Sequence, residues 1–328
     1  CIRDRYETLQ GKAYVGSALE LLGQIPGASI DLVLTSPPFA LQRKKEYGNF
    51  NQGQYVDWLL SFTSEVKRVL KDTGSFVLDL GGAYQKGKPV RSLYNYRVLL
   101  RLCDEQGWNL AEEFFWYNPA KLPSPIEWVN KRKIRVKDAV NTVWWLAKTD
   151  FPKADVKRVL TPYSDRMKLL LKSKEKFYTP KKRPSGHDIS LQFCNNNGGA
   201  IPPNLLQIPN TESNSVYLQC CKIIGIKAHP ARFPQKFPEF FIKMLTEPGD
   251  VVLDIFAGSN TTGAATESLA RKWIAFEINR EYLAASAFRF LDKPSEKKVQ
   301  SIYETLMSGE VTQAYKIPKV VQLQLIDI

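Results

Sequence analysis

The sequence contains few of the residues that build metal centres and disulfide frameworks. Its 328 residues include two histidines, His187 and His229, and five cysteines, none of which stands in a CxxC pair. A zinc site needs clustered Cys or His ligands, and a disulfide framework needs paired cysteines. We therefore expect no metal site and no disulfide framework, and a reducing cytosol as the location. The cysteines are Cys1, Cys103, Cys194, Cys220 and Cys221.

Long hydrophobic runs are also missing. No apolar stretch approaches the roughly 18 residues that cross a bilayer, and no signal peptide opens the sequence. We therefore expect no membrane partner. The first residue is Cys1 rather than Met, so we expect the natural chain to start further upstream. With 44% hydrophobic residues the chain can build a core, and its length allows one large α/β domain with or without an inserted module.

Positive charge is plentiful but unevenly placed. The net charge is +13, and the segment 121–183 alone holds 18 basic and 6 acidic residues, a net of +12. Such a run can be an ordinary solvated surface. Here aromatic residues are interleaved with the charges, which favours a polyanion partner, most simply nucleic acid. The aromatic residues are Trp128, Trp144, Trp145, Phe151, Tyr163, Phe177 and Tyr178.

Short apolar runs alternate with segments of helical periodicity in both halves of the chain. This alternation predicts a doubly wound, mostly parallel α/β sheet. Between about 150 and 215 many prolines interrupt the pattern, which predicts a loop-rich insert outside the sheet. We expect a turn at Asp72–Gly74, strands at 13–16, 30–34, 75–80, 108–117, 139–147, 251–256 and 272–278, and helices at 18–25, 55–70, 94–106, 238–245, 264–270 and 281–291.

The strongest cofactor signal is the segment 251–263, where a predicted strand runs into a loop of small and hydroxyl residues before a helix. Backbone N–H groups of such a loop can meet a ligand at the carboxyl end of the sheet. Glu277 stands 19 residues after Gly258, at the end of the next strand, where a carboxylate can accept hydrogen bonds from ribose hydroxyls. The loop lacks the GxGxxG fingerprint and the Gly-Lys-Ser/Thr of a phosphate-binding loop. Each feature alone could be a tight turn or a surface acid; together they favour S-adenosylmethionine, an adenosine ligand without pyrophosphate.

A second signal is Ser36-Pro37-Pro38-Phe39, which follows another predicted strand. By itself this segment could be a rigid turn. Two prolines lock the backbone, so the Ser36 hydroxyl and the Pro37 carbonyl could serve as two fixed acceptors, with Phe39 as a flat apolar wall. This set suits an exocyclic amine on an aromatic ring.

These motifs resemble those of the amino-group DNA methyltransferases, whose catalytic signature is Asp/Asn/Ser-Pro-Pro-Tyr/Phe and whose cofactor signature is Phe-x-Gly. The order here, with the catalytic motif first, a basic region next and the cofactor motif last, is similar to the circularly permuted β class. The serine form is typical of enzymes that methylate cytosine N4. The likeness extends over most of the chain, through 19–22, 40–48, 116–119 and 229–234. One departure is Gly16-Ser17, where the family has Gly-Asp with the acid on the cofactor adenine.

The resemblance implies a Rossmann-like methyltransferase that transfers a methyl group from S-adenosylmethionine to cytosine N4 in double-stranded DNA by base flipping, leaving S-adenosylhomocysteine. It suggests the modification half of a type II restriction–modification system and the sequence CAGCTG. One flipped base per event requires only a monomer, so we expect action as a monomer. We expect 1–149 to hold the catalytic part, 150–215 a target-recognition insert and 216–328 the cofactor part. Two alternatives stay open. The same fold could methylate adenine N6 or act on RNA, or the chain could be an inactive DNA-binding relative.

The resulting site prediction has three groups. Asp79 could simply cap a turn at a strand end, but a carboxylate beside Ser36 could hold the serine proton, so we place it in the catalytic group. His229 is expected to be structural, and Trp116, Tyr117 and Asn118 could belong to the core or to the base pocket. The catalytic group is Ser36, Pro37, Pro38, Phe39 and Asp79. The cofactor group is Ser17, Phe233, Asp254, Phe256, Gly258, Ser259, Asn260, Thr261 and Glu277. The DNA-binding group is Arg43, Lys44, Lys131, Arg132, Lys133, Lys181, Lys182, Arg183 and His187.

Overall fold

The computed structural model describes residues 5–39, 52–172 and 195–314 of the chain. These residues form one ten-stranded sheet in the order β10-β1-β2-β9-β8-β3-β4-β6-β5-β7. The central run from β2 to β4 is parallel, whereas β6 is antiparallel to both its neighbours. The expected doubly wound, mostly parallel sheet is therefore confirmed. The strands are Arg5–Glu7 (β1), Gly11–Val15 (β2), Ile30–Thr35 (β3), Leu70–Leu80 (β4), Asn109–Tyr117 (β5), Val140–Ala147 (β6), Leu205–Gln207 (β7), Val251–Asp254 (β8), Lys272–Glu277 (β9) and Thr312–Gln313 (β10).

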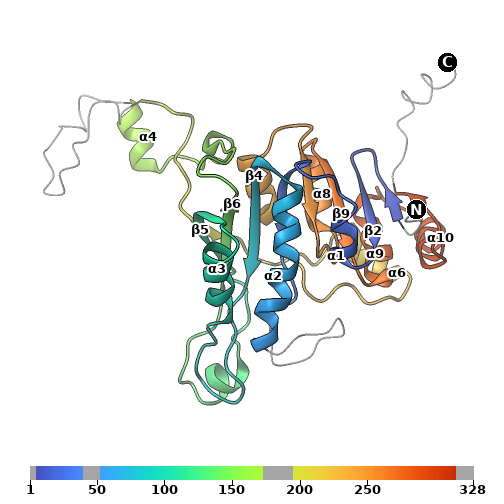
Figure 1. The fold of residues 1–328 in the computed structure, drawn as a ribbon, viewed down its shortest axis with the longest axis horizontal. Coiled ribbons are helices and arrows are strands. Elements are labelled where there is room, and N and C mark those ends of the chain that lie inside the picture. The colour runs from blue at the N-terminus through green and yellow to red at the C-terminus, as the bar shows by residue number, and fades with distance from the viewer. Residues whose placement is uncertain (1–4, 40–51, 173–194, 315–328) are drawn as a thin grey trace, which may run out of the picture.

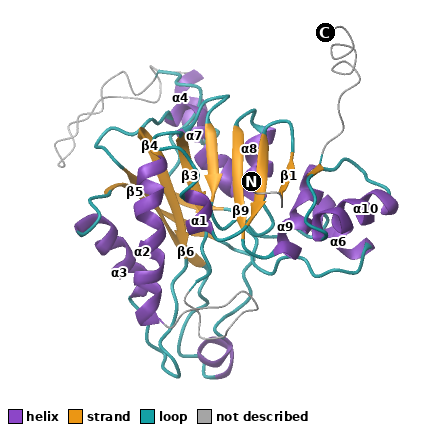
Figure 2. Cartoon of the chain, turned by 45° about the vertical axis from the view of Figure 1, so that its right-hand side comes forward, coloured by secondary structure: helices purple, strands orange, loops and turns teal. Residues whose placement is uncertain are grey.

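Helices cover both faces of this sheet (Figures 1 and 2). They are Ala18–Leu22 (α1), Gln52–Val69 (α2), Tyr94–Asp104 (α3), Asp165–Lys172 (α4), Val216–Ile223 (α6), Lys236–Leu245 (α7), Thr261–Ser268 (α8), Arg280–Ser286 (α9) and Glu296–Met307 (α10). Short helical turns lie at Glu127–Lys131 (η1), Val156–Val159 (η2) and Ala287–Phe290 (η4). No helix among the described residues is long and apolar enough to cross a membrane.

The central strand β3 shows why the sheet needs helices on both of its faces. All six of its residues are buried. Successive side chains of a strand point to opposite faces. Val33 accordingly joins the core beneath α2 and α3, while Leu32 and Leu34 join the core beneath α7 and α8. A third core links α6, α9 and α10 to β1, β2 and β9 around Trp273.

The predicted turn at Asp72–Gly74 is wrong, because these residues lie inside β4. Ile30 pairs with Leu70 but Leu32 pairs with Ser75, so the extra residues of β4 form an irregularity in the ladder. Gly74 fits this bulge, since a Cβ there would lie 3.1 Å from the Asp31 carbonyl oxygen. A Gly after polar residues marks a bulge as well as a turn, and only strand pairing distinguishes the two.

The expectation that the insert lies wholly outside the sheet is also wrong. Residues Leu205–Gln207 form β7, which pairs in parallel with β5 at the edge of the sheet. Val159 and Leu206 are buried in the same core as α7. A three-residue edge strand flanked by Pro203 and Pro209 carries too little periodicity to be recognised from its sequence.

The basic segment 121–183 is divided by the fold between two edges of the sheet. Residues 121–139 belong to the connection between β5 and β6, at the edge where β3 and β4 end. The insert begins at the opposite edge, where the Lys153 N–H donates to the Thr73 carbonyl at 2.9 Å near the start of β4. Figure 1 shows α4 at that upper edge.

Candidate active site

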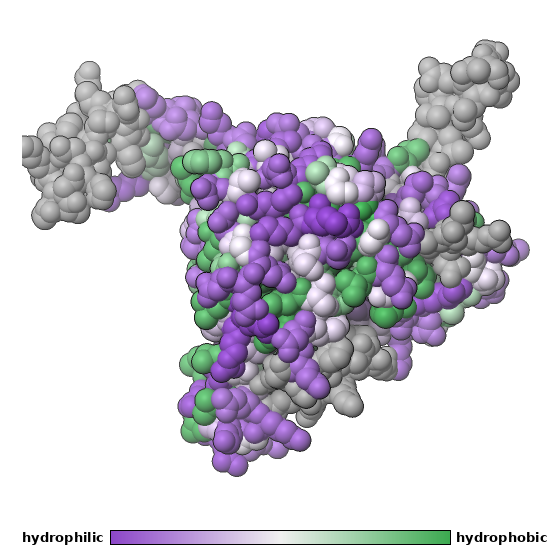
Figure 3. All heavy atoms as spheres, in the orientation of Figure 1, coloured by the Kyte–Doolittle hydropathy of each residue, from purple (hydrophilic) through white to green (hydrophobic). Residues whose placement is uncertain are grey.

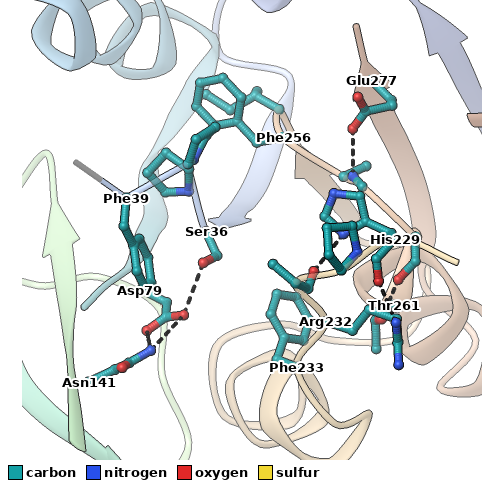
Figure 4. Close-up of a pocket in the computed structure, with 18 of the residues that line it drawn as sticks. Ser36, Phe39, Asp79, Asn141, His229, Arg232, Phe233, Phe256, Thr261 and Glu277 are labelled. Carbon is teal, nitrogen blue, oxygen red and sulfur yellow. Dashed lines mark hydrogen bonds between the residues drawn. The ribbon is translucent and has the colours of Figure 1, made fainter. Parts of the chain in front are cut away.

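A cavity of about 780 Å³ opens at the carboxyl edge of the parallel strands. This size suits a small-molecule site of the usual range. One wall follows β3 and β4, and the opposite wall follows β8 and β9 (Figure 4). Because crossover helices leave parallel strands at this edge, the loops that follow separate strands are gathered around one space.

Ser36 and Asp79 meet on the first wall. Thr35 pairs with Leu78 in the parallel ladder, so the residues just beyond them lie side by side. The Ser36 hydroxyl donates to Asp79 Oδ2 at 3.0 Å, and the Asn141 amide donates to Asp79 Oδ1 at 3.1 Å. The hydrogen bond expected between Ser36 and Asp79 is therefore present. Asn141, from the start of β6, was not predicted, since nothing in the sequence indicates that β6 lies antiparallel beside β4.

Burial changes the acidity of Asp79. Its side chain is almost fully inaccessible to solvent, and desolvation raises its pKa to about 6, although hydrogen bonds from Asn141 and Ser36 act in the opposite direction. At neutral pH the group is still mainly a carboxylate. It can therefore accept the Ser36 proton, and it takes up a proton more readily than an ordinary aspartate does.

Phe39 lies against Gly81, directly after the end of β4, and completes the first wall. A Cβ on Gly81 would lie 2.5 Å from Phe39 Cε2 and 3.0 Å from Asn141 Oδ1, so only glycine leaves room for the ring here. Pro37 and Pro38 also line the cavity. The four residues of the predicted catalytic motif thus surround one space together with Asp79.

The second wall is built on Glu277 and Gly258. Glu277 ends β9, and its Oε2 accepts the Gly258 N–H at 2.8 Å, while Oε1 accepts the Asn279 N–H at 2.9 Å. Burial raises the pKa of the Glu277 carboxyl. Each oxygen keeps a further lone pair, so a hydroxyl donor in the cavity could still be bound. Gly258 has φ +53°, which glycine adopts without strain.

Asp254 and Asn260, which we predicted to contact the cofactor, are not among the residues that line the cavity. Asp254 accepts hydrogen bonds from the hydroxyls of Thr35 at 2.7 Å and Thr262 at 2.6 Å. Asn260 accepts the Gly263 N–H at 3.0 Å and donates to the Tyr6 hydroxyl at 2.8 Å. Both side chains stabilise the loop from the side that faces away from the cavity. The sequence shows that they belong to the loop, but the direction in which a loop side chain points depends on its backbone.

The other predicted cofactor residues do line the cavity. Ser17 precedes α1 and makes no side-chain cap there. Phe256 packs with ring centroids 5.6 Å from Trp58 and 5.2 Å from Phe62, which anchors the loop to α2. Ser259, Thr261 and Phe233 complete this group at the cavity surface.

The segment His229–Phe233 lies over the loop that contains Gly258 (Figure 4). A Cβ on Gly258 would come within 3.0 Å of His229 Cε1, so the imidazole ring rests directly on this glycine. The Arg232 guanidinium donates to the His229 carbonyl. Its Nε is buried and has no hydrogen-bond partner among the described residues. A buried orphan donor on the cavity wall indicates room for an acceptor such as a carboxylate.

Arg289 supports the same loop and was missed by sequence analysis. Its Nε donates to the Ser259 carbonyl at 2.6 Å and its Nη2 to the Ser259 hydroxyl at 3.0 Å. The guanidinium also pairs with Glu212 at 3.2 Å and lies 4.7 Å from the centre of the Tyr217 ring. A lone arginine 30 residues beyond the loop gives no signal in the sequence.

The predicted DNA-binding residues fall into two sets. Lys131, Arg132 and Lys133 are exposed on the connection between β5 and β6, where the first two contact Glu127. Lys133 has φ +53°. The remaining predictions, Arg43, Lys44, Lys181, Lys182, Arg183 and His187, lie outside the described residues. Within the described ranges, no cluster of His, Cys, Asp or Glu is arranged to hold a metal ion.

Comparison with known proteins gives one consistent answer. The sequence model of the N6/N4 methyltransferases, described as DNA methylases, matches residues 30–288. The chain is 65% identical over 306 residues to the type II methyltransferase M.PvuII of Proteus hauseri, which covers 93% of this chain and 91% of that protein. It superposes on the solved PvuII DNA methyltransferase (cytosine-N4-specific) with a TM-score of 0.79, 56% identity in the structural alignment, and coverage of 95% of this chain and 98% of that one.

A solved structure with lower sequence identity supports the fold of this chain but not its function. A protein of Thermus thermophilus, solved as a complex with S-adenosyl-L-methionine, superposes with a TM-score of 0.54 at 18% identity. The superposition covers 93% of this chain and 98% of that one. The architecture is therefore also found in a protein solved with S-adenosyl-L-methionine.

Proposed function

The chain belongs to the N6/N4 family of DNA methylases and is a type II, cytosine-N4-specific DNA methyltransferase, and we propose that it transfers the methyl group of S-adenosylmethionine to a flipped cytosine in the duplex sequence CAGCTG. The observation that carries this proposal is the cavity that places the Ser36–Asp79 pair opposite the Gly258–Glu277 loop. One wall suits an amine and the other suits a nucleoside cofactor.

The residues of the second wall fit the cofactor. Glu277 would accept hydrogen bonds from the ribose hydroxyls with its remaining lone pairs. The unpartnered Nε of Arg232 would meet the carboxylate of the methionine part. Ser17 stands where the family has an acid, so we propose a hydroxyl contact there in place of the charged one. S-adenosylmethionine supplies a methyl group activated by the positive charge of its sulfur.

The first wall fits the cytosine amine. Because the Ser36 hydroxyl donates its hydrogen to Asp79, its oxygen lone pairs remain available to one N4–H of the base. The Pro37 carbonyl would accept the second N4–H, and Phe39 would stack on the ring. Two acceptors draw the nitrogen toward tetrahedral geometry and make its lone pair available. A base inside a duplex is out of reach of this cavity, so flipping costs about a few kcal/mol before reaction.

Positioning and proton removal then follow from the same residues. Holding the amine in line with the methyl carbon is the largest contribution we expect, on the order of several kcal/mol. After transfer the N4 nitrogen must lose a proton. We propose that it passes through the Ser36 hydroxyl to Asp79, whose pKa of about 6 lies above that of an exposed aspartate.

A single substitution tests this assignment. Ser36→Ala removes the acceptor and breaks the link to Asp79, so methyl transfer should fall by at least about a hundredfold. The measurement is incorporation of labelled methyl groups into duplex CAGCTG, followed by nucleoside analysis of the product. Parent-like incorporation by Ser36→Ala would refute the catalytic role of the serine.

The same experiment addresses the alternatives. N6-methyladenine as the product would point to the adenine branch of the family, and methylation of RNA but not duplex DNA would point to an RNA substrate. An inactive DNA-binding relative would show no cofactor-dependent thermal shift. The presence of both walls in one cavity favours the active enzyme. A monomer suffices for one flipped base per event, and we propose that state for the active protein.

A further inference from the structure

Two connections project together from the carboxyl edge of the sheet. Residues 82–92 join β4 to α3, and residues 118–139 join β5 to β6. We call them the prong; they form the lowest part of the described chain in Figures 1 and 2. Arg91 Nη1 donates to Asp138 Oδ2 at 2.6 Å, and Arg135 Nη2 donates to the Pro89 carbonyl at 2.7 Å. These bonds join the two connections into one element.

The prong is strongly basic. It contains nine Lys or Arg residues and two acidic residues, a net charge of +7. Both carboxylates are already paired, Asp138 with Arg91 and Glu127 with Lys131 and Arg132. Most of the basic side chains of the prong therefore have no carboxylate of the prong as an ion-pair partner. Figure 3 shows hydrophilic residues at this lower end of the molecule, with hydrophobic ones among them.

The hydrophobic residues of the prong are unusually exposed. Leu122 is 81% exposed and Val136 is 86% exposed. Lys137 Nζ donates to the carbonyls of Pro119 at 3.0 Å and Lys121 at 3.3 Å, which ties the two stretches that carry these side chains. Lys121 lines the catalytic cavity, and Leu122, which follows it in the chain, is exposed to solvent. Proteins that unstack bases commonly insert such an aliphatic side chain.

We propose that the prong is the element that enters a groove of the duplex beside the flipped cytosine, with its basic side chains on the phosphates and Leu122 filling the space that the flipped base leaves. The inference rests on the proposed function. Charge complementarity favours DNA as the partner, because the prong carries an excess of +7 and three of its residues, Asn118, Lys121 and Ala139, line the cavity that receives the base. The insert starts at the opposite edge of the sheet, near Thr73, and its end returns to the cavity, where Asn210 belongs to the lining.

Paired charge variants test the phosphate contacts. Lys131→Ala/Lys133→Ala and Lys86→Ala/Lys88→Ala each remove two exposed charges from the prong. Lys297→Ala/Lys298→Ala removes two exposed charges from α10 and serves as the matched control. Binding to a CAGCTG duplex should weaken, and the slope of log K against log salt should fall by about one to two, in the prong variants only. Thermal shift with S-adenosylmethionine should stay parental.

Leu122→Ala tests the wedge. Each cytosine of CAGCTG is replaced in turn by 2-aminopurine, whose fluorescence rises when the base leaves the stack. We expect the rise in 2-aminopurine fluorescence to be about threefold smaller with Leu122→Ala than with the parent, and intermediate with Leu122→Met. With Phe151→Ala the rise should equal that of the parent. Phe151 is the matched control, since it is 87% exposed but stands two residues before Lys153, at the opposite edge of the sheet.

The outcomes separate the two proposals. The prong would not be a phosphate-binding element if the prong variants kept the parental salt slope. The same would follow if the α10 variant lost as much DNA affinity as the prong variants. Parental fluorescence with Leu122→Ala would overturn the wedge. A parent protein that binds duplex DNA and methylates it while these variants behave normally would leave the proposed function intact. A parent that neither binds nor methylates DNA would contradict the proposed function, and the prong proposal with it.

Discussion

The Thr35 hydroxyl donates to Asp254 Oδ1 at 2.7 Å, and both groups are buried. This bond joins the residue before Ser36 to the strand that leads into the cofactor loop. This side-chain contact adds to the β3–β8 ladder in holding the two walls of the cavity together.

Thr35→Val should separate the walls slightly without changing side-chain volume. A buried carboxylate that loses a donor costs about 1–3 kcal/mol of unfolding free energy. Because Asp254 also accepts the Phe256 N–H at 3.1 Å, the loop should shift and the Kd for S-adenosylmethionine should rise. Denaturant unfolding and calorimetric titration measure the two effects. Thr63→Val, another buried threonine with a side-chain partner in Gln106, is the control and should lower stability while leaving cofactor affinity unchanged.

Methyl transfer should depend on the protonation of Asp79. Burial raises its pKa to about 6, so below that pH the group is protonated and no longer accepts the Ser36 hydrogen. We expect kcat at saturating cofactor to fall about tenfold per pH unit below pH 6 and to be level above it. Single-turnover rates from pH 5 to 8 measure this profile.

Asp79→Asn is the discriminating variant for this profile. Burial also raises the pKa values of Glu277 and Asp254, so either could cause an acid limb. The Asp79→Asn variant should transfer methyl groups slowly at every pH, and its rate should not fall further at acid pH. A limb that persists in this variant would belong to Glu277 or Asp254, and the proton pathway proposed through Ser36 would be wrong.

Gly258→Ala should damage cofactor binding more than stability. At φ +53° a non-glycine residue costs about 1–2 kcal/mol, and the new Cβ would lie 3.0 Å from His229 Cε1. Gly249→Ala places a Cβ at φ +89° with no atom within 4 Å, so it reproduces the backbone strain alone. We expect similar losses of thermal stability in both, but a rise of the KM for S-adenosylmethionine only in Gly258→Ala. Equal KM values would show that the imidazole contact does not matter.

Arg289→Met should raise the KM for S-adenosylmethionine while kcat changes little, because the arginine holds Ser259 in the loop and touches no reacting atom. Arg289→Lys keeps the charge and one donor, so we expect an intermediate KM. The control is Arg271→Met, which removes another buried arginine whose partner is Thr246 at the end of α7. If Arg271→Met raised the KM as much as Arg289→Met, general destabilisation would explain both.

Local patterns in the sequence predicted much of this molecule. A buried strand before Ser36-Pro37-Pro38-Phe39 and another before the Gly258 loop indicated two walls at one sheet edge, because parallel strands end at the same edge. The expected pairing of Ser36 with Asp79 depended on strands β3 and β4 being neighbours, which the family resemblance implied and the structure shows.

The sequence by itself determined the alternation of strands and helices and the residue types at the two loops, since periodicity and turn chemistry are local properties. The tertiary structure decided which side chains face the cavity: Asn141 and Arg289 come from remote elements, whereas Asp254 and Asn260 point behind the loop. It also divided one basic segment between opposite edges of the sheet. Direction and distance depend on how strands pair and how loops turn, and these long-range relations are not encoded in the spacing of any single segment.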